Sequence, residues 1–184
     1  MWYRELKHEI LIIGRGGQGI LLLGKILGEA LTLSGLNVVA MESYGAETRG
    51  TESRVEMIVS DNPEGIDFVK VRKPNIGVIL YPFNLEKNLS KFIEGSILIL
   101  DSINVKELPI TKSSWRIYSK PFTDIAEKKI GTSRVVNMVV LGYLINKTKL
   151  AKPEVVEEAI KNSVDEKWVS PNIKAFREGL NIAD

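Results

Sequence analysis

Hydrophobic residues along this chain form short continuous runs and longer segments with helical spacing. Residues 10–13 form a continuous apolar run that ends at Gly14, and a short run bounded by glycine predicts a central parallel strand. Through residues 20–33 hydrophobic residues recur every three or four positions, and Gly35 follows where a helix commonly ends. Residues 36–41 are mostly apolar again. The pattern therefore predicts a strand–helix–strand unit with a right-handed crossover.

The rest of the hydrophobic pattern predicts further strands followed by helices. Strands are expected at residues 55–59, 76–81, 96–100 and 115–118. Helices are expected over residues 85–93 and 135–145, from Pro153 onward, and as a last short helix that begins at Pro171. We see no repeat and no long linker, so residues 1–184 are predicted to form a single domain. The predicted fold is α/β, an open and mostly parallel Rossmann-like sheet with helices on both faces and a helical C-terminal part.

Composition narrows the chemistry that this domain can perform. The 25 Lys and Arg residues nearly balance the 23 Asp and Glu residues, which argues against nucleic acid or an anionic membrane as a partner. The chain has no cysteine, so it cannot by itself hold a disulfide, a zinc–thiolate site or a cysteine-ligated iron–sulfur cluster. The first residues do not resemble a signal peptide and the apolar runs are interrupted by Gly, Lys and Glu, so we expect a cytoplasmic protein.

A glycine-rich turn joins the first predicted strand to the first predicted helix. Its G-x-G-x-x-G pattern places free backbone N–H groups at a helix N-terminus, where they favour an anion. A nicotinamide-binding protein also needs an acid at the end of the second strand, and Glu42 lies near that place. Dinucleotide binding, another phosphate-bearing ligand and a turn that only permits close packing all remain open. The candidate residues are Gly14, Arg15, Gly16, Gly17, Gln18 and Gly19.

A charged loop follows the second predicted strand. Ligands of open α/β sheets gather at the carboxyl ends of strands, so we expect this loop to face the glycine turn. The aromatic ring of Tyr44, the guanidinium group of Arg49 and the carboxylate of Glu47 could contact a ligand or a partner. Alternatively, these side chains could simply keep a connecting loop soluble. The candidate residues here are Ser43, Tyr44, Gly45, Glu47, Arg49 and Gly50.

Other residues that could carry chemistry are few. His8 is the only histidine, and we expect it at the surface just before the first strand. Asp101, which ends a predicted strand, is either a site acid or an ordinary cap of the next turn. We therefore predict no catalytic residue and no metal site in this chain.

Taken together, five segments of the sequence resemble the gamma subunit of the 2-oxoacid:ferredoxin oxidoreductases. The two loops carry most of this resemblance, because the pair is far more specific than either loop alone. The segments are the GRGGQGI turn (14–20), the LLLGKILGEA helix (21–30), the SYGAETRG loop (43–50), the GSILILD strand (95–101) and the NMVVLG helix (137–142). Within the family, the SYG loop and residues 66–75 are more similar to the 2-oxoglutarate type than to the pyruvate type.

The resemblance implies a subunit that is inactive by itself. Its partners would be an alpha subunit, a beta subunit that binds thiamine diphosphate and a delta subunit that carries iron–sulfur clusters. Such a complex oxidatively decarboxylates a 2-oxoacid, forms an acyl-coenzyme A and passes the electrons to ferredoxin. The glycine turn and the SYG loop would form the contact surface with other subunits and part of the path for coenzyme A. The alternative is a separate Rossmann-like protein that binds NAD(P) or coenzyme A.

Overall fold

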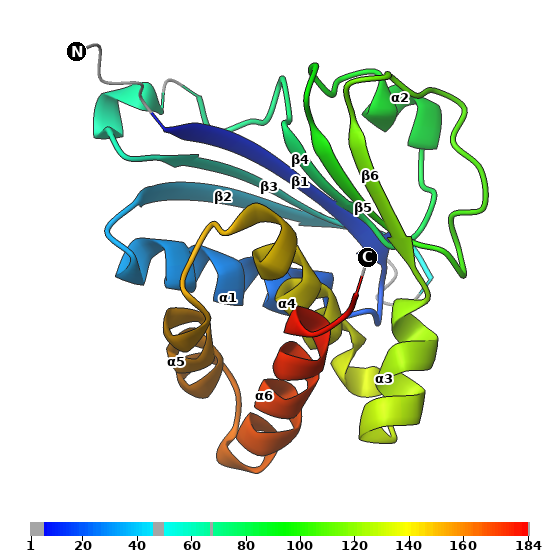
Figure 1. Cartoon of the computed structure of the whole chain (residues 1–184). Coiled ribbons are helices and arrows are strands. Elements are labelled where there is room, and N and C mark those ends of the chain that lie inside the picture. Colours follow the sequence, from blue (N-terminus) through cyan, green and yellow to red (C-terminus); the bar gives the residue numbers. More distant parts are fainter. Residues whose placement is uncertain (1–5, 46–49, 67, 184) are drawn as a thin grey trace.

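The computed structural model describes residues 6–45, 50–66 and 68–183. These residues form a six-stranded sheet with most helices packed against one face (Figure 1). The strands are β1 (Lys7–Arg15), β2 (Asn37–Tyr44), β3 (Glu52–Ser60), β4 (Ile76–Ile79), β5 (Ile97–Asp101) and β6 (Arg116–Lys120). The helices are α1 (Ile20–Leu33), α2 (Leu85–Leu89), α3 (Phe122–Ile130), α4 (Val136–Thr148), α5 (Pro153–Ser163) and α6 (Glu166–Leu180), with short 3-10 turns at Pro63–Gly65 and Ser133–Val135.

The strand order is β2-β3-β1-β4-β5-β6. Neighbouring strands from β1 through β4 and β5 to β6 are parallel, whereas β3 is antiparallel to both β1 and β2. The predicted α/β class and the mostly parallel sheet are confirmed. The predicted strand–helix–strand unit, β1–α1–β2, is also present. Its two strands are not neighbours in the sheet, because β3 follows β2 in the chain and pairs between β1 and β2. An antiparallel return needs only a short connection, and the chain between β2 and β3 is short.

The two faces of the sheet are covered very unequally. On one face, α1 and the C-terminal helices α3 to α6 bury the larger hydrophobic core, which includes Ile12, Leu27 and Met138 (Figure 1). The other face carries a smaller core around Phe92 and Trp115, covered by the short α2 and the segment that leads to β6. The helices predicted on both faces are therefore present, but the second face is covered mainly by irregular chain.

Helix α4 is the centre of the helical layer. Its residues Val136–Ile145 are all buried, as expected for a segment that is apolar on nearly every side. It crosses α6 at two glycines: a Cβ added at Gly142 would lie 2.0 Å from the Phe176 carbonyl oxygen, and one added at Gly179 would lie 2.0 Å from the Val139 carbonyl oxygen. The two backbones therefore touch directly, a contact that only glycine permits.

The prediction that Pro171 begins the last helix is wrong. Helix α6 begins at Glu166 and continues through Pro171. Proline lacks the N–H that would bond one turn back, which costs one hydrogen bond near the helix start. The buried residues Ala175 and Phe176 on the next turns keep the helix packed on the core. Within the described residues, no helix is both long enough and apolar enough to cross a membrane.

Candidate functional site

The glycine turn connects β1 to α1 and is closed by the side chain of Gln18. Gln18 Oε1 accepts a hydrogen bond from the Arg15 backbone N–H at 2.6 Å, and the Gln18 N–H donates to the Arg15 carbonyl at 3.0 Å. Gly17 has φ of +99° and nothing near the position of a Cβ. Two internal hydrogen bonds thus close the turn, and its outer side at Gly17 is open.

Two glycines of the turn are required by close neighbours. A Cβ on Gly14 would lie 2.5 Å from Ile20 Cδ1. Gly19, the N-cap of α1, has φ of +70°, and a Cβ there would lie 2.4 Å from Asn137 Nδ2. That amide donates to the Gly19 carbonyl at 3.1 Å and ties the turn to α4. Gly14 and Gly19 therefore serve close packing, which was one of the three possibilities open from the sequence.

The second candidate segment meets the glycine turn directly. Ser43 and Tyr44 form the end of β2 and are not part of a loop as predicted, because they pair with β3 at Arg54 and Ser53. Gly45 follows the strand and Gly50 precedes β3, whereas Glu47 and Arg49 lie outside the described residues.

The expected convergence of the two segments is observed. The Gly16 N–H donates to the Thr51 carbonyl at 2.9 Å, so the glycine turn and the start of β3 are joined by their backbones. The carboxyl ends of β1 and β2 and the beginning of β3 therefore lie at the same rim of the sheet.

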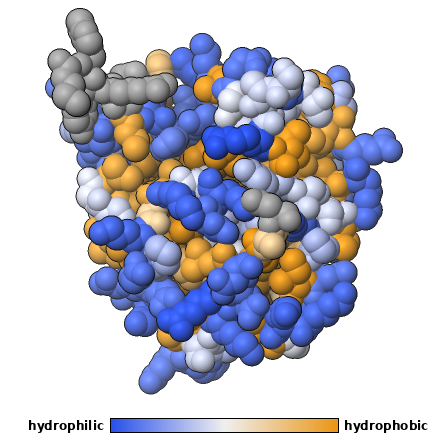
Figure 2. Space-filling model, viewed as in Figure 1, coloured by the Kyte–Doolittle hydropathy of each residue, from blue (hydrophilic) through white to orange (hydrophobic). Residues whose placement is uncertain are grey.

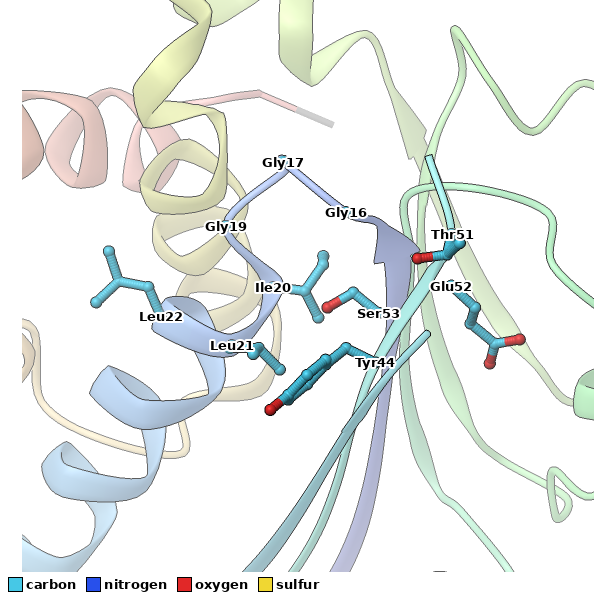
Figure 3. A pocket seen from close by; sticks show the side chains of 10 residues that line it. All are labelled: Gly16, Gly17, Gly19, Ile20, Leu21, Leu22, Tyr44, Thr51, Glu52 and Ser53. Atoms are coloured by element: carbon cyan, nitrogen blue, oxygen red, sulfur yellow. The ribbon is translucent and has the colours of Figure 1, made fainter. Parts of the chain in front are cut away.

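A cavity of about 450 Å³ lies between the two segments, and we call it the turn cavity. Figure 3 shows the side chains of Ile20, Leu21 and Tyr44 pointing into the same space, while the Glu52 carboxylate points away from it. The other lining residues are Gly16, Gly17, Gly19, Leu22, Thr51 and Ser53.

The turn cavity offers apolar contact surface beside the N-terminus of a helix. Tyr44 is 71% exposed although its neighbours are apolar. The first turn of α1 carries no acidic side chain, and its N-cap Gly19 has no side-chain hydrogen bond. The Arg15 side chain turns toward the Tyr81 ring, 5.4 Å from its centroid. This arrangement suits the docking of an apolar or aromatic group.

The dinucleotide interpretation needs Glu42 beside the glycine turn, and the topology separates them. In that motif the acid lies at the end of the strand next to the first one. Here β3 lies between β1 and β2, and Glu42 is an exposed residue of the outermost strand. Neighbouring strands are about 4.8 Å apart, so Glu42 lies one strand too far away. The geometry therefore does not favour a separate NAD(P)-binding protein.

A second cavity of about 330 Å³ lies on the opposite face of the same strands, beside α2. Its lining is polar, and we call it the lysine cavity because Lys70, Lys87 and Lys91 line it together with Arg54. The sequence interpretation missed it. The signal that could have revealed it is the recurrence of the charged residues Glu52, Arg54 and Glu56 at every second position of β3, which places their side chains on one face.

His8 and Asp101 are both structural in this fold. His8 is half-buried and not at the surface as predicted, with its Nδ1 3.0 Å from Asn75 Nδ2, and burial lowers the pKa of its imidazole. Asp101 is fully buried, and burial raises the pKa of its carboxyl group. Its Oδ1 accepts from the Ile103 N–H at 2.9 Å, so of the two possibilities open from the sequence the structure supports a turn cap.

The fold and the turn cavity define a Rossmann-like α/β domain that presents a glycine turn and an exposed tyrosine at one rim of its sheet. Residues 9–182 match the family model described as pyruvate ferredoxin/flavodoxin oxidoreductase. The chain belongs to this family of oxidoreductases, and the family resemblance predicted from the sequence is confirmed.

Relatives match the chain over nearly their full length. It is 39% identical to the 2-oxoglutarate synthase subunit KorC of Methanothermobacter marburgensis, over 96% of this chain and 97% of the relative. It is 37% identical to the subunit of the same name from Methanocaldococcus jannaschii, over 97% and 95%. The crystal structure of a keto/oxoacid ferredoxin oxidoreductase gamma subunit from Geobacter sulfurreducens superposes with a TM-score of 0.78 at 32% identity, covering 94% of this chain and 95% of that one.

Proposed function

We propose that this chain is the gamma subunit of a 2-oxoglutarate:ferredoxin oxidoreductase. Such a complex converts a 2-oxoacid and coenzyme A to an acyl-coenzyme A and carbon dioxide, and the two electrons released reduce ferredoxin. The observation that carries the proposal is the full-length similarity to two relatives named as 2-oxoglutarate synthase subunits. The family match over residues 9–182 supports the same class of reaction.

The role of this chain in the complex is assembly through the rim of the sheet around the turn cavity. Exposed aromatic residues beside apolar pockets are typical anchors of protein interfaces. Tyr44 and the apolar first turn of α1 supply such an anchor. The hydrogen bond between Gly16 and Thr51 holds the surface in one shape before a partner arrives, which lowers the entropy cost of binding.

The cofactors of the complex reside in partner chains in this proposal. An alpha subunit, a beta subunit with thiamine diphosphate and a delta subunit with iron–sulfur clusters would complete the enzyme, with ferredoxin as electron acceptor. The absence of cysteine from the whole sequence supports this division, because cluster irons are held mainly by cysteine thiolates. Coenzyme A would approach the partner's active site along the surface that the glycine turn and Tyr44 help to form. We place the assembled complex in the cytoplasm.

Co-expression tests the proposal. The chain is produced with candidate alpha, beta and delta subunits, and native mass spectrometry measures which of them remain together. The purified complex is then assayed for ferredoxin reduction with 2-oxoglutarate and with pyruvate in the presence of coenzyme A. We expect a stable complex that prefers 2-oxoglutarate. A gamma chain that stays alone contradicts the subunit role, and a complex that prefers pyruvate contradicts the substrate.

A matched pair of variants tests the docking surface. Tyr44→Ala removes the exposed ring, and the loss of an interface anchor costs about 2 kcal/mol, or roughly thirtyfold in subunit affinity. Leu33→Ala is the control, because Leu33 is also exposed, at 48%, but lies at the far end of α1. Dilution of the complex followed by mass photometry measures both affinities. Equal dissociation of the two variants would exclude the turn cavity from the interface.

A further inference from the structure

The floor of the lysine cavity is a closed network of polar side chains around Arg54. Its Nε donates to Glu52 Oε1 at 2.8 Å, and its Nη1 donates to Glu56 Oε1 at 3.4 Å. Its Nη2 donates to Asn88 Oδ1 at 2.9 Å, which links β3 to α2. Asn84 Nδ2 also donates to Glu52 Oε2 at 3.2 Å. The guanidinium donors of Arg54 thus bond to Glu52, Glu56 and Asn88 at the base of the cavity. This network fixes α2 beside β3.

The lysines that line the cavity come from two segments of the chain. Lys70 precedes β4, Lys87 lies in α2, and Lys91 follows one helical turn later. Among the described residues, no ion pair joins any of the three ammonium groups to a carboxylate. Three like charges that line one cavity repel one another and do not stabilise the fold. A bound anion would relieve this repulsion.

The charge of the site exceeds what its own acids can neutralise. Arg54 and the three lysines line the cavity with a single carboxylate, that of Glu56. Even when Glu52 behind Arg54 is included, an excess of two positive charges remains. The Glu56 carboxylate is almost completely buried and accepts from the Val71 N–H at 3.2 Å, so it is committed to the fold. An added anion would meet ammonium groups and not this carboxylate.

We propose that the lysine cavity binds a small, multiply charged anion of the phosphate class, such as a diphosphate group. Lysine ammonium groups act as point charges that bind phosphate well. Inorganic diphosphate carries about three to four negative charges near neutral pH, because each phosphate group carries roughly one and a half to two. Its charge is opposite in sign to the excess positive charge of the cavity. The volume of about 330 Å³ is sufficient for such a ligand. The site lies on the opposite face of the sheet from the turn cavity and does not depend on the proposed subunit role.

A titration of the full-length chain with inorganic pyrophosphate tests the site. Calorimetry measures the affinity, and amide chemical shifts measured by NMR locate the ligand. We expect saturable binding that weakens as sodium chloride is added, since these charges are near the surface. The largest shifts should be those of Ser43, Lys87 and Asn88, which line the cavity. If binding is not saturable, or if the shifts centre on Gly16 and Gly17, the proposal is overturned.

A matched pair of double variants separates this site from nonspecific attraction. Lys87→Gln/Lys91→Gln removes two charges at the cavity, and we expect the affinity for pyrophosphate to fall by at least about tenfold. Lys128→Gln/Lys129→Gln removes the same charge from the end of α3 and should leave the affinity unchanged. Thermal unfolding without the anion shows that both variants fold. Equal affinities for the two double variants would overturn the proposal.

Discussion

The direct backbone contact between α4 and α6 makes Gly142→Ala a sharp test of this fold. The new Cβ would lie 2.0 Å from the Phe176 carbonyl oxygen and 2.9 Å from the Leu180 nitrogen. Carbon and oxygen atoms normally stay about 3.3 Å apart or more, so the helices would have to separate by roughly 1 Å. Both obstacles are backbone atoms, which cannot rotate away as a side chain can.

The expected loss of stability follows from two opposing effects. Overpacking of a tight core costs about 1–3 kcal/mol, and the upper part of this range applies because α4 is buried along ten consecutive residues, Val136–Ile145. Alanine is the better helix former by about 1 kcal/mol. The net loss is therefore about 2 kcal/mol in the free energy of unfolding. In a chain of this size that loss lowers the melting temperature by roughly 4–8 °C.

Urea unfolding followed by circular dichroism measures this loss. Gly28→Ala is the control, because a Cβ there meets only Met57 Cε at 3.4 Å and Val38 Cγ1 at 3.8 Å, and we expect it to be neutral or stabilising by up to about 1 kcal/mol. The double variant Gly142→Ala/Gly179→Ala should cost less than the sum of its parts, since one separation of the helices relieves both clashes. Unchanged stability of Gly142→Ala, or an equal loss in the control, would refute the reasoning.

Two further predictions concern buried polar groups. Glu56→Gln should lower the free energy of unfolding by about 2 kcal/mol, because it weakens the charged partner of Arg54 in a buried network; urea unfolding at pH 7 checks this, and a loss below about 0.5 kcal/mol would contradict it. For His8, burial lowers the pKa of the imidazole in the folded state below its usual value of 6.5. As the pH is lowered through 6.5 the unfolded chain therefore binds more protons than the folded chain, and the free energy of unfolding decreases. The wild type should therefore lose more stability than His8→Ala between pH 7.5 and pH 5.5 in parallel urea titrations, and equal losses would contradict this assignment.

The elements of the fold could largely be predicted from hydrophobic spacing, whereas the sheet order could not. The continuous apolar run before Gly14 and the helical spacing that follows correspond to β1 and α1. Most of strand β3 is buried, and its hydrophobic pattern does not show whether its neighbours run parallel or antiparallel. The position of β3 between β1 and β2 therefore required the structure. Pro171 was misleading because packing of the α6 face outweighs one lost hydrogen bond.

The sequence predicted the segments that meet at one of the two cavities, the turn cavity, and not the lysine cavity. The rule that strand ends share a rim correctly predicted that the glycine turn would approach the segment after β2. The lysine cavity was not predicted because Arg54, Lys70 and the Lys87–Lys91 pair are separated in sequence and line one cavity only when α2 packs beside β3. Side chains such as Lys70 and Lys87 are indistinguishable from ordinary solvated lysines until the folded chain brings them together.

On the face shown in Figure 2, hydrophobic residues appear as several separate patches among hydrophilic ones. The smaller core around Phe92 and Trp115 rests under one short helix and irregular chain, so few contacts oppose its transient opening. Hydrogen exchange should be fastest in the segment between β5 and β6 and slowest in α4. Local unfolding of this protein would then begin on the face of the sheet that carries the lysine cavity, while the strands stay paired under the helical layer.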